Sequence, residues 1–417
     1  MDKILSRLRP ISLALLLVAI LPLTWANYRF ATNNPGGNDF LVHWEGARAL
    51  LIEGLSPYSD EVAIRIQVHT YGRPAASGEN ELRVAYPLYS LVIFAPFALI
   101  GDFTLARALW MTFLEIALIA IPFICIMLTR WRPGNLVLIF FLIFFVVWYH
   151  GMRPLINGNV VILVTLFLLV AVCFLKTRRD EMVGVMLAIS TIKPHIVLLP
   201  IIFILLCSVS QKRYKVLLWL LISLIILTVI AAFFIPDWPI QNLREVLRYT
   251  SYNPPVTPGA VFKVWFPGSG ARLGYLMSLF LAILLIIEWV FARTGEFRWF
   301  LWTFSLTLVI SQWIGIPTDP GNFIILTLPL VLVFAMWTER WGTTGLVMVV
   351  ISLIVLVAGL WLLFLNTLTF EGQPVQNPVM FFPLPLFLLI GMYWVRWWAI
   401  KPPRLLIEEL QEFESQP

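Results

Sequence analysis

The chain has 417 residues, of which 60% are hydrophobic and only 12% are charged, and its formal net charge is +6. A soluble domain is typically about half apolar and about a quarter charged, so this composition excludes an ordinary soluble protein. Basic residues in the loops of a membrane protein usually report its orientation, and the positive charge therefore does not indicate nucleic-acid binding. The three cysteines all lie within apolar segments and are interpreted as buried hydrophobic side chains.

Long, continuous apolar segments follow one another along the chain, which favours membrane-spanning helices over the alternating strands of a barrel. The first segment resembles a signal peptide, but no small-residue cleavage site follows it, so we interpret it as an uncleaved helix with its N-terminus inside. The candidate spans are residues 11–26, 87–100, 104–128, 136–149, 160–175, 182–207, 216–235, 273–291, 299–316, 323–337, 345–365 and 379–398. Several are shorter than the roughly 20 residues that a span needs. We predict an all-α polytopic membrane protein, with about 12 transmembrane helices in one integral membrane domain over residues 1–417.

The number of membrane crossings is uncertain by one, because the segment 182–207 is either one span or a broken hairpin. It contains Lys193-Pro194, and a proline can break a helix at this point. A broken hairpin here would place the basic clusters 176–179 and 212–213 on one side of the membrane, as the positive-inside rule prefers. With twelve crossings, the tail 401–417 is predicted to be cytoplasmic.

Two polar segments, residues 27–86 and 236–272, are too long to be simple turns and are predicted to face outside together. In the first, Phe40, Leu41 and Trp44 share one helical face, and His43 and Glu45 point away from it. This pattern predicts a helix that lies in the membrane interface. A second short helix is predicted over residues 60–69. The other loop has Pro and Gly pairs that predict turns around residues 261–266.

Asp39 stands where the first polar segment turns into this interfacial helix. Aspartate is among the best N-cap residues, so Asp39 is interpreted either as a helix cap or as a catalytic base. Lys193 is the sharpest anomaly in the apolar segments, because a buried lysine is costly unless it faces a cavity, a partner or the interface. It either snorkels from a helix break or supplies a cation to a lipid-linked phosphate.

Other polar residues have weaker signals. Tyr86 stands before Pro87, where the loop re-enters the membrane, and Asn159 opens the next span, where a polar amide is usually a cap. Of the basic residues in the external loops, Arg83 and Lys263 are candidates to bind phosphate. The sequence contains no Walker loop, dinucleotide fingerprint, HExxH or Gly-x-Ser-x-Gly motif, so the classes that those motifs mark lose support.

Several of these motifs together resemble glycosyltransferase family 87, which contains polyprenol-phosphate-mannose-dependent α-mannosyltransferases and many uncharacterised bacterial relatives. The most specific part is the first-loop signature. The matching positions are Asp39-Phe40-Leu41-Val42-His43-Trp44, Ala47-Arg48-Ala49-Leu50-Leu51, Gly54 and Ser56-Pro57-Tyr58. Tyr86-Pro87 is similar to a Tyr-Pro-Pro motif, Gly158-Asn159 to a Gly-Gln helix start, and Gly184 through Lys193-Pro194 to a Gly-rich helix that ends in Lys-Pro. Late in the chain the family often carries histidines, whereas this sequence has Asp319 and Asn322 in the comparable stretch.

The resemblance implies a GT-C-type scaffold, a polyprenyl-phosphate sugar donor, a lipid or glycan acceptor, and inversion at the anomeric carbon. It implies that Asp39 removes the proton of the acceptor hydroxyl. Lys193, Tyr86, Arg83, His43, Asn159, Lys263 and Asp319 are the expected substrate-binding residues. Neither a metal nor another cofactor is demanded by the residues present. The expected location is the cell membrane, a bacterial plasma membrane by the family default.

A transporter or flippase for a lipid-linked or small solute is the alternative from another functional class. Such a protein should show inverted repeats with broken helices paired between its halves. The sequence shows one break, at Lys193-Pro194, and no clear partner for it. The enzyme is therefore the main hypothesis.

Overall fold

The computed structural model describes residues 20–252, 257–370 and 374–401, and these are almost entirely helical. Residues 20–33 form a helix that precedes the labelled elements. The α-helices are α2 (Asn38–Arg48), α3 (Asp60–Tyr71), α4 (Leu91–Ala98), α5 (Phe103–Thr129), α6 (Asn135–Val147), α7 (Tyr149–Asn157), α8 (Val161–Lys176), α9 (Asp180–Ser190), α10 (Pro194–Ser210), α11 (Tyr214–Phe234), α12 (Trp238–Tyr252), α13 (Pro258–Trp265), α14 (Gly270–Ala292), α15 (Phe297–Ser311), α16 (Thr327–Thr367) and α17 (Pro383–Ile400). A π-helical turn, η1 (Ala49–Glu53), and the 3-10 helices η2 (Leu88–Ser90), η3 (Pro320–Leu326) and η4 (Pro378–Phe381) join them. The strands β1 (Thr369–Phe370) and β2 (Pro374–Val375) pair antiparallel between α16 and α17.

The ends of several helices follow from short polar signals in the sequence. The Ser59 hydroxyl accepts the Val62 N–H at the start of α3, and Gly72 ends that helix in the left-handed conformation with φ 72°. Asp102 caps α5 by accepting the Leu105 N–H at 2.7 Å. These caps satisfy backbone donors that would otherwise be unpaired.

Among the described residues, five helical stretches are long and apolar enough to cross a membrane, and six if the bent pair α6 and α7 counts as one span. The predicted helical membrane fold is therefore confirmed, but the count of twelve is not. The helices α8, α10 and α15 have 16, 17 and 15 residues, fewer than the roughly 20 residues of a typical span. Residues 11–19 of the first predicted span and 402–417 of the predicted tail lie outside the described residues.

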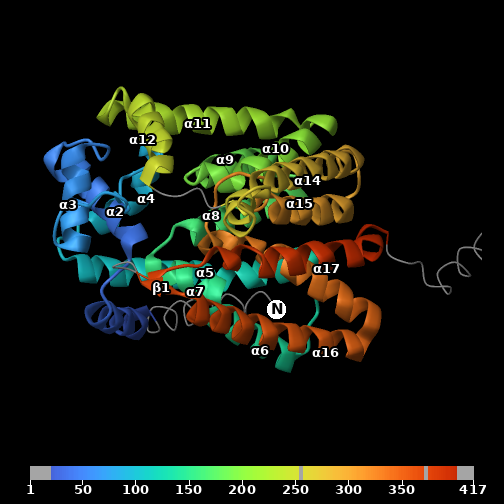
Figure 1. The fold of residues 1–417 in the computed structure, drawn as a ribbon. Coiled ribbons are helices and arrows are strands. Elements are labelled where there is room, and N and C mark those ends of the chain that lie inside the picture. The colour runs from blue at the N-terminus through green and yellow to red at the C-terminus, as the bar shows by residue number, and fades with distance from the viewer. Residues whose placement is uncertain (1–19, 253–256, 371–373, 402–417) are drawn as a thin grey trace, which may run out of the picture.

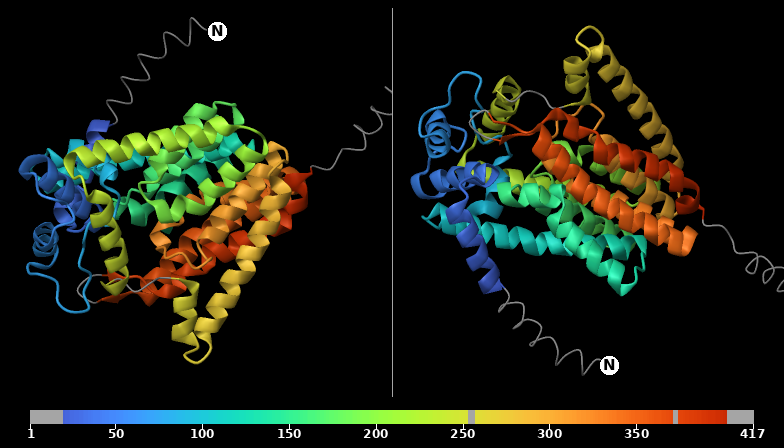
Figure 2. Two further views of the ribbon diagram at one scale, coloured as in Figure 1. Left: turned by 90° about the horizontal axis from the view of Figure 1, so that it is seen from above. Right: turned by 60° about the horizontal axis from the view of Figure 1, so that its bottom comes forward.

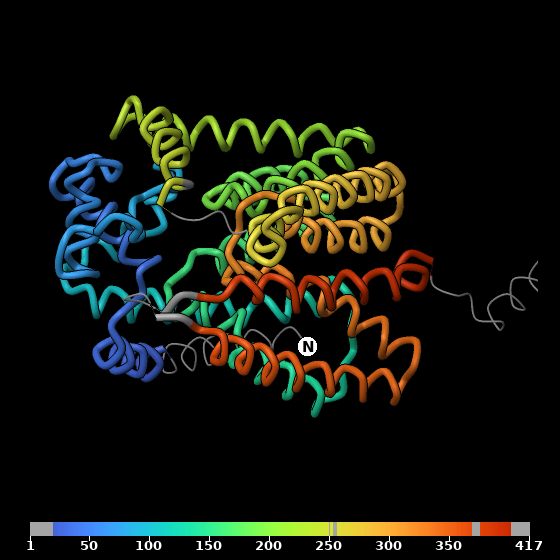
Figure 3. The backbone as a smooth tube through the Cα atoms, viewed as in Figure 1, coloured from blue at the N-terminus to red at the C-terminus, as the bar shows by residue number. Residues whose placement is uncertain are grey.

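Two predicted spans, 323–337 and 345–365, occur in one long helical stretch that is broken inside α16. Gly342 has non-helical backbone there, with φ 51° and ψ −118°, which a glycine adopts without a side-chain clash. The orange part of the trace in Figure 3 changes direction at this break. The predicted break at Lys193-Pro194 is also present, because α9 ends at Ser190 and α10 begins at Pro194.

The apolar helices form a bundle, and the polar segments gather at one end of it. In Figure 1, α2, α3 and α12 lie together at the left end of the long helices, and both views in Figure 2 agree. The outer surfaces of α11 and α14 carry exposed apolar side chains, with Phe233 84% and Tyr275 78% exposed. Such surfaces are typical of helices that contact lipid.

The two polar segments that the sequence predicts to be external loops contact each other directly. The Ser56 hydroxyl donates to the Gln241 side chain at 2.6 Å, and Asn242 donates to the Tyr86 carbonyl at 3.0 Å. The predicted interfacial helix, whose apolar face runs from Phe40 to Leu51, is present as α2 with η1, and the predicted helix over residues 60–69 is present as α3. The second loop is mostly helical, whereas the sequence predicted turns, since α12 was not recognised and α13 covers the region around residue 261.

Candidate active site

Asp39 lies in the first turn of α2, and it is not the cap of that helix. Gly37 occupies the N-cap position with φ 79°, and no side-chain cap hydrogen bond is present. The Asp39 carboxylate instead accepts hydrogen bonds from the Asn159 amide at 2.9 Å and from the Asn157 amide at 3.4 Å. The capping interpretation is therefore wrong, because the helix begins one residue before Asp39. The half-buried carboxylate keeps acceptor capacity for a further partner.

The backbone around Asp39 is fixed by a buried arginine on α5. Arg107 is 2% exposed and donates to the Asn34 carbonyl at 2.7 Å and to the Ile156 carbonyl at 3.2 Å. It thereby joins the segment before α2 to the end of α7, which carries Asn157. A Cβ atom at Gly37 would lie 2.5 Å from the Arg107 Nε atom, so only glycine fits there. Arg107 thus connects the backbone on the N-terminal side of Asp39 to the helix that carries Asn157.

Asn159 links the carboxylate of Asp39 to the buried cation of Lys193. Its Oδ1 atom accepts from Lys193 Nζ at 3.0 Å and from the Val161 N–H at 2.9 Å, while its amide nitrogen donates to Asp39. Lys193 also donates to Asn322 Oδ1 at 2.7 Å. Among the described residues no carboxylate lies within ion-pair distance of Lys193, which is 5% exposed. The two charges therefore face one another across a single amide group.

Residues of the late segment, where family 87 often carries histidines, complete this hydrogen-bond network. Asn322, in η3, donates to the Thr318 hydroxyl at 3.2 Å, and that hydroxyl donates to the side-chain Oε1 atom of Gln312 at 3.3 Å. Asp319 is exposed and accepts the Gly321 N–H at 2.6 Å. The stretch of Asp319 and Asn322 therefore reaches the same cluster as Asp39 and Lys193.

Aromatic rings line the other side of Lys193. Its Nζ atom lies 5.8 Å from the centre of the Tyr86 ring, and the His43 ring packs between Tyr86 and Phe94 at 4.2 and 4.7 Å. The prediction that His43 points away from the buried face is wrong, because its side chain is 5% exposed inside this aromatic stack. Burial, with a smaller effect from Lys193, lowers the pKa of His43 to about 3, so the ring is neutral.

Opposing effects act on the Asp39 carboxyl. Burial raises its pKa above the ordinary value of 3.8, and the Asp319 charge adds to that rise. Lys193, the Asn159 hydrogen bond and Arg153 act in the opposite direction by favouring the ionised form. A carboxylate with a raised pKa is a stronger proton acceptor than a solvated one. The cluster thus combines a base, a buried cation and neutral hydrogen-bonding groups.

Two predicted substrate-binding residues lie outside this cluster. Arg83 is 8% exposed and forms an ion pair with Glu245 at 2.5 Å and another with Asp60 at 2.7 Å. Lys263 is exposed on α13 and forms no contact with Asp39 or Lys193. The cluster therefore brings together Asp39, His43, Tyr86, Asn159, Lys193 and the Asp319 segment.

Sequence reasoning missed the roles of Arg107 and Asn157. Arg107 had a usable signal, because a charged residue inside an apolar span is rare and faces protein or a cavity. Asn157 had none, since a single amide near the end of a short helix has many ordinary explanations.

Comparison with known proteins supports the chemistry that the cluster permits. The model of glycosyltransferase family 87 matches residues 85–253, which include Tyr86, Asn159 and Lys193 but begin after Asp39. The matched segment is less than half of the chain. No match to the chain was found among curated proteins or among solved structures. The expected resemblance and the expectation of a glycosyltransferase are thus confirmed through the match of residues 85–253 to family 87, in a chain with several helices long and apolar enough to cross a membrane.

Proposed function

We propose that this enzyme transfers a sugar, mannose by the family default, from a polyprenyl-phosphate donor to a hydroxyl of a lipid or glycan acceptor. The reaction takes place on the external face of the cell membrane, where the two polar segments meet. The observation that carries the proposal is the Asp39 carboxylate, which is partly accessible, does not cap α2, and lies across one amide from the buried cation Lys193.

Each group has one role in the proposed reaction. Asp39 takes the proton of the acceptor hydroxyl while that oxygen forms a bond to the anomeric carbon. The bond from the anomeric carbon to the phosphate oxygen breaks, and its electron pair leaves with the polyprenyl phosphate, which inverts the configuration. Lys193 has three N–H donors, of which two are used by Asn159 and Asn322, so the third is available to a phosphate oxygen. The scaffold is then of the GT-C type.

Asp39→Asn tests the base directly. The purified enzyme is incubated with a panel of polyprenyl-phosphate sugars, and release of polyprenyl phosphate is measured. Loss of a general base is expected to lower the rate by about 10²- to 10⁴-fold. The matched control is Asp102→Asn, since Asp102 is an aspartate whose carboxylate caps α5. That variant should keep its activity and nearly all of its stability, because Asn caps a helix about as well as Asp. Turnover of Asp39→Asn at the wild-type rate would refute the assignment of Asp39 as the base.

A further inference from the structure

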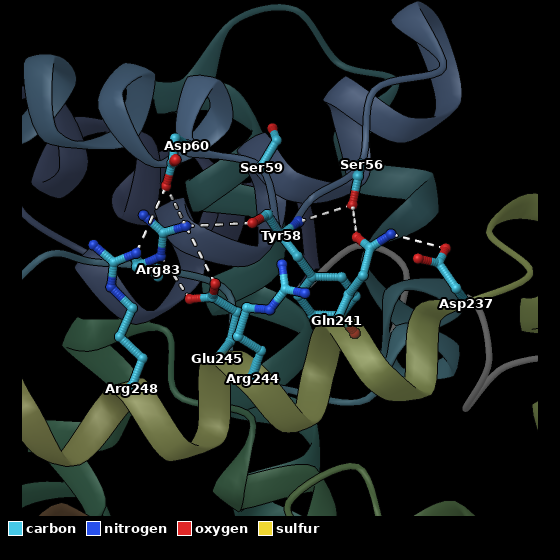
Figure 4. Close-up of a pocket in the computed structure, with 10 residues that line it drawn as sticks. All are labelled: Ser56, Tyr58, Ser59, Asp60, Arg83, Asp237, Gln241, Arg244, Glu245 and Arg248. Carbon is cyan, nitrogen blue, oxygen red and sulfur yellow. Dashed lines mark hydrogen bonds and ion pairs between the residues drawn. The ribbon is translucent and has the colours of Figure 1, made fainter.

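A second polar feature lies beside the Asp39 cluster, between the first loop and α12. It is a pocket of about 350 Å³, within the size range of small-molecule sites. Its lining consists of polar and charged residues, namely Ser56, Tyr58, Ser59, Asp60, Arg83, Asp237, Gln241, Arg244, Glu245 and Arg248 (Figure 4). An aliphatic chain would gain nothing from such walls, so the pocket does not suit the lipid part of a donor.

The charges of this pocket are balanced, and most of them are already paired. Its three arginines stand against three acids, and Arg83 is held by Glu245 and Asp60. Gln241 is held by Ser56 and by Asp237, to which it donates at 2.9 Å. Preset donors and acceptors of both signs, with no net charge, favour a neutral ligand rich in hydroxyl groups over a phosphate.

Arg244 is the residue that remains available to such a ligand. It is exposed, and among the described residues no carboxylate lies within ion-pair distance of it. Figure 4 shows it extending from α12 toward the side chains of the first loop. The exposed Asp237 carboxylate accepts from Gln241 through one oxygen, and in the part of the chain that the structure describes its other oxygen has no hydrogen-bond partner. Within the described residues, one donor group and one acceptor group therefore face the pocket without a protein partner.

The pocket shares a wall with the candidate active site. The Tyr58 hydroxyl, in the lining, donates to the Tyr86 carbonyl at 2.8 Å, and Asn242 donates to the same carbonyl at 3.0 Å. The ring of that tyrosine packs against His43, which follows Asp39 by one helical turn. Tyr86 therefore contacts both the lining of the pocket and α2, the helix that carries the proposed base.

The helix that forms one side of the pocket is built to lie on a membrane surface. Ile240, Leu243 and Leu247 share one face of α12 and are 65%, 58% and 69% exposed, whereas Gln241 and Glu245 point toward the first loop. A helix with one apolar and one polar face lies in the bilayer interface. The pocket is then held at the level where a membrane-bound acceptor presents its headgroup.

We propose that this pocket binds the acceptor, and that the acceptor is an uncharged, hydroxyl-rich glycan whose reacting hydroxyl extends past Tyr86 to Asp39. Arg244 and Asp237 bind the glycan hydroxyls and determine which acceptor is used. The proposal rests on the proposed glycosyl transfer for the meaning of "acceptor", but binding of a sugar to the pocket can be measured without the reaction.

The test uses the full-length protein in nanodiscs with methyl α-mannoside, methyl α-glucoside and methyl β-galactoside as probes. Binding is measured by saturation-transfer NMR in the absence of donor. At least one probe should bind the wild type, and Arg244→Ala and Asp237→Asn should each weaken it by about tenfold, as expected for one hydrogen bond to a charged group. The matched control is Arg272→Ala, an exposed arginine of the second loop outside the pocket, which should bind like the wild type.

Three results would overturn the proposal: no probe binds the wild type, both pocket variants bind as well as the wild type, or inorganic phosphate displaces the probe at millimolar concentration. In the transfer assay, Arg244→Ala should raise the acceptor KM and leave kcat and the donor KM unchanged. Asp39→Asn separates the two proposals, since it should still bind the probe. If Asp39→Asn also transfers sugar at the wild-type rate, the assignment of the base fails while the pocket stands.

Discussion

Lys193 and Arg83 are both buried cations that the sequence predicts to bind phosphate, but the groups that they contact carry different charges. Lys193 is held by two neutral amide oxygens, from Asn159 and Asn322. Arg83 is held by the carboxylates of Glu245 and Asp60. A cation whose partners are neutral keeps its charge for an incoming anion, whereas a cation inside an ion pair is already neutralised. Partners, more than burial, thus decide which cation can serve a substrate.

The Arg83 ion pair has a structural role that its position makes plain. Arg83 belongs to the first loop and Glu245 to α12, so the pair joins the two polar segments that sequence places far apart. Removing one partner of a buried pair leaves the other charge uncompensated, which typically costs about 3–5 kcal/mol. The two cations should therefore fail in different ways when each is replaced.

The largest difference is expected for Lys193→Met. Loss of a preorganised group that stabilises charge in the transition state typically lowers kcat by about 10²- to 10³-fold, and the fold should persist because a methionine fills the same space. The measurement is the rate of polyprenyl-phosphate release, with thermal unfolding as the check on folding. Lys263→Met is the control: this exposed lysine of α13 should change the rate less than about twofold. An unchanged rate in Lys193→Met would reduce Lys193 to a structural residue.

Replacing Arg83 should mainly lower the stability of the protein. Arg83→Met should lower the free energy of unfolding by about 3–5 kcal/mol, because Glu245 is left buried without its partner. The double variant Arg83→Met with Glu245→Met removes both charges and should regain most of that loss. Thermal unfolding of the wild type, both single variants and the double variant forms a complete cycle. If Arg83→Met instead unfolds like the wild type and loses transfer as Lys193→Met does, Arg83 is a substrate cation.

Local sequence patterns predicted the elements on which the site stands. The apolar periodicity from Phe40 to Leu51 gave α2, and the Lys193-Pro194 break separates α9 from α10, because both depend on neighbouring residues. The amphipathic pattern did not reveal that His43 is buried, since its partners Tyr86 and Phe94 lie more than forty residues away. The count of twelve spans is not confirmed, since five or six helical stretches among the described residues are long and apolar enough to cross a bilayer and several other predicted segments are helices of 15 to 17 residues.

The polar cluster also combines residues that the sequence identifies with contacts that it does not show. Asp39, Asn159 and Lys193 were each singled out, but nothing in the sequence shows that one amide would lie between the two charges. The Arg83 pairing with Glu245 joins residues 162 positions apart, and such a contact has no local signature. Which cation is free and which is paired is therefore information that only the folded chain contains.

The smallest expected effect is a shift in the pH dependence of the transfer rate, and it distinguishes the two cations. Asp39 acts as a base only when ionised, so the transfer rate should fall as the pH drops through its pKa, which burial raises above the ordinary value of 3.8. The Lys193 charge lowers that pKa. Lys193→Met should therefore move the acidic limb of the profile to higher pH, and the residual rate should recover as the pH rises.

The Arg83 variants separate this effect from a general loss of packing. Arg83 is absent from the groups that shift the Asp39 pKa, so the double variant of Arg83 and Glu245 should keep the acidic limb at the wild-type position. The profiles of kcat are measured for the wild type, Lys193→Met and the double variant in the same buffers. An equal shift of the acidic limb in both variants would mean that the shift comes from looser packing of the site and not from the Lys193 charge. A shift in Lys193→Met alone would mean that the lysine and the aspartate interact as one ionised pair across Asn159.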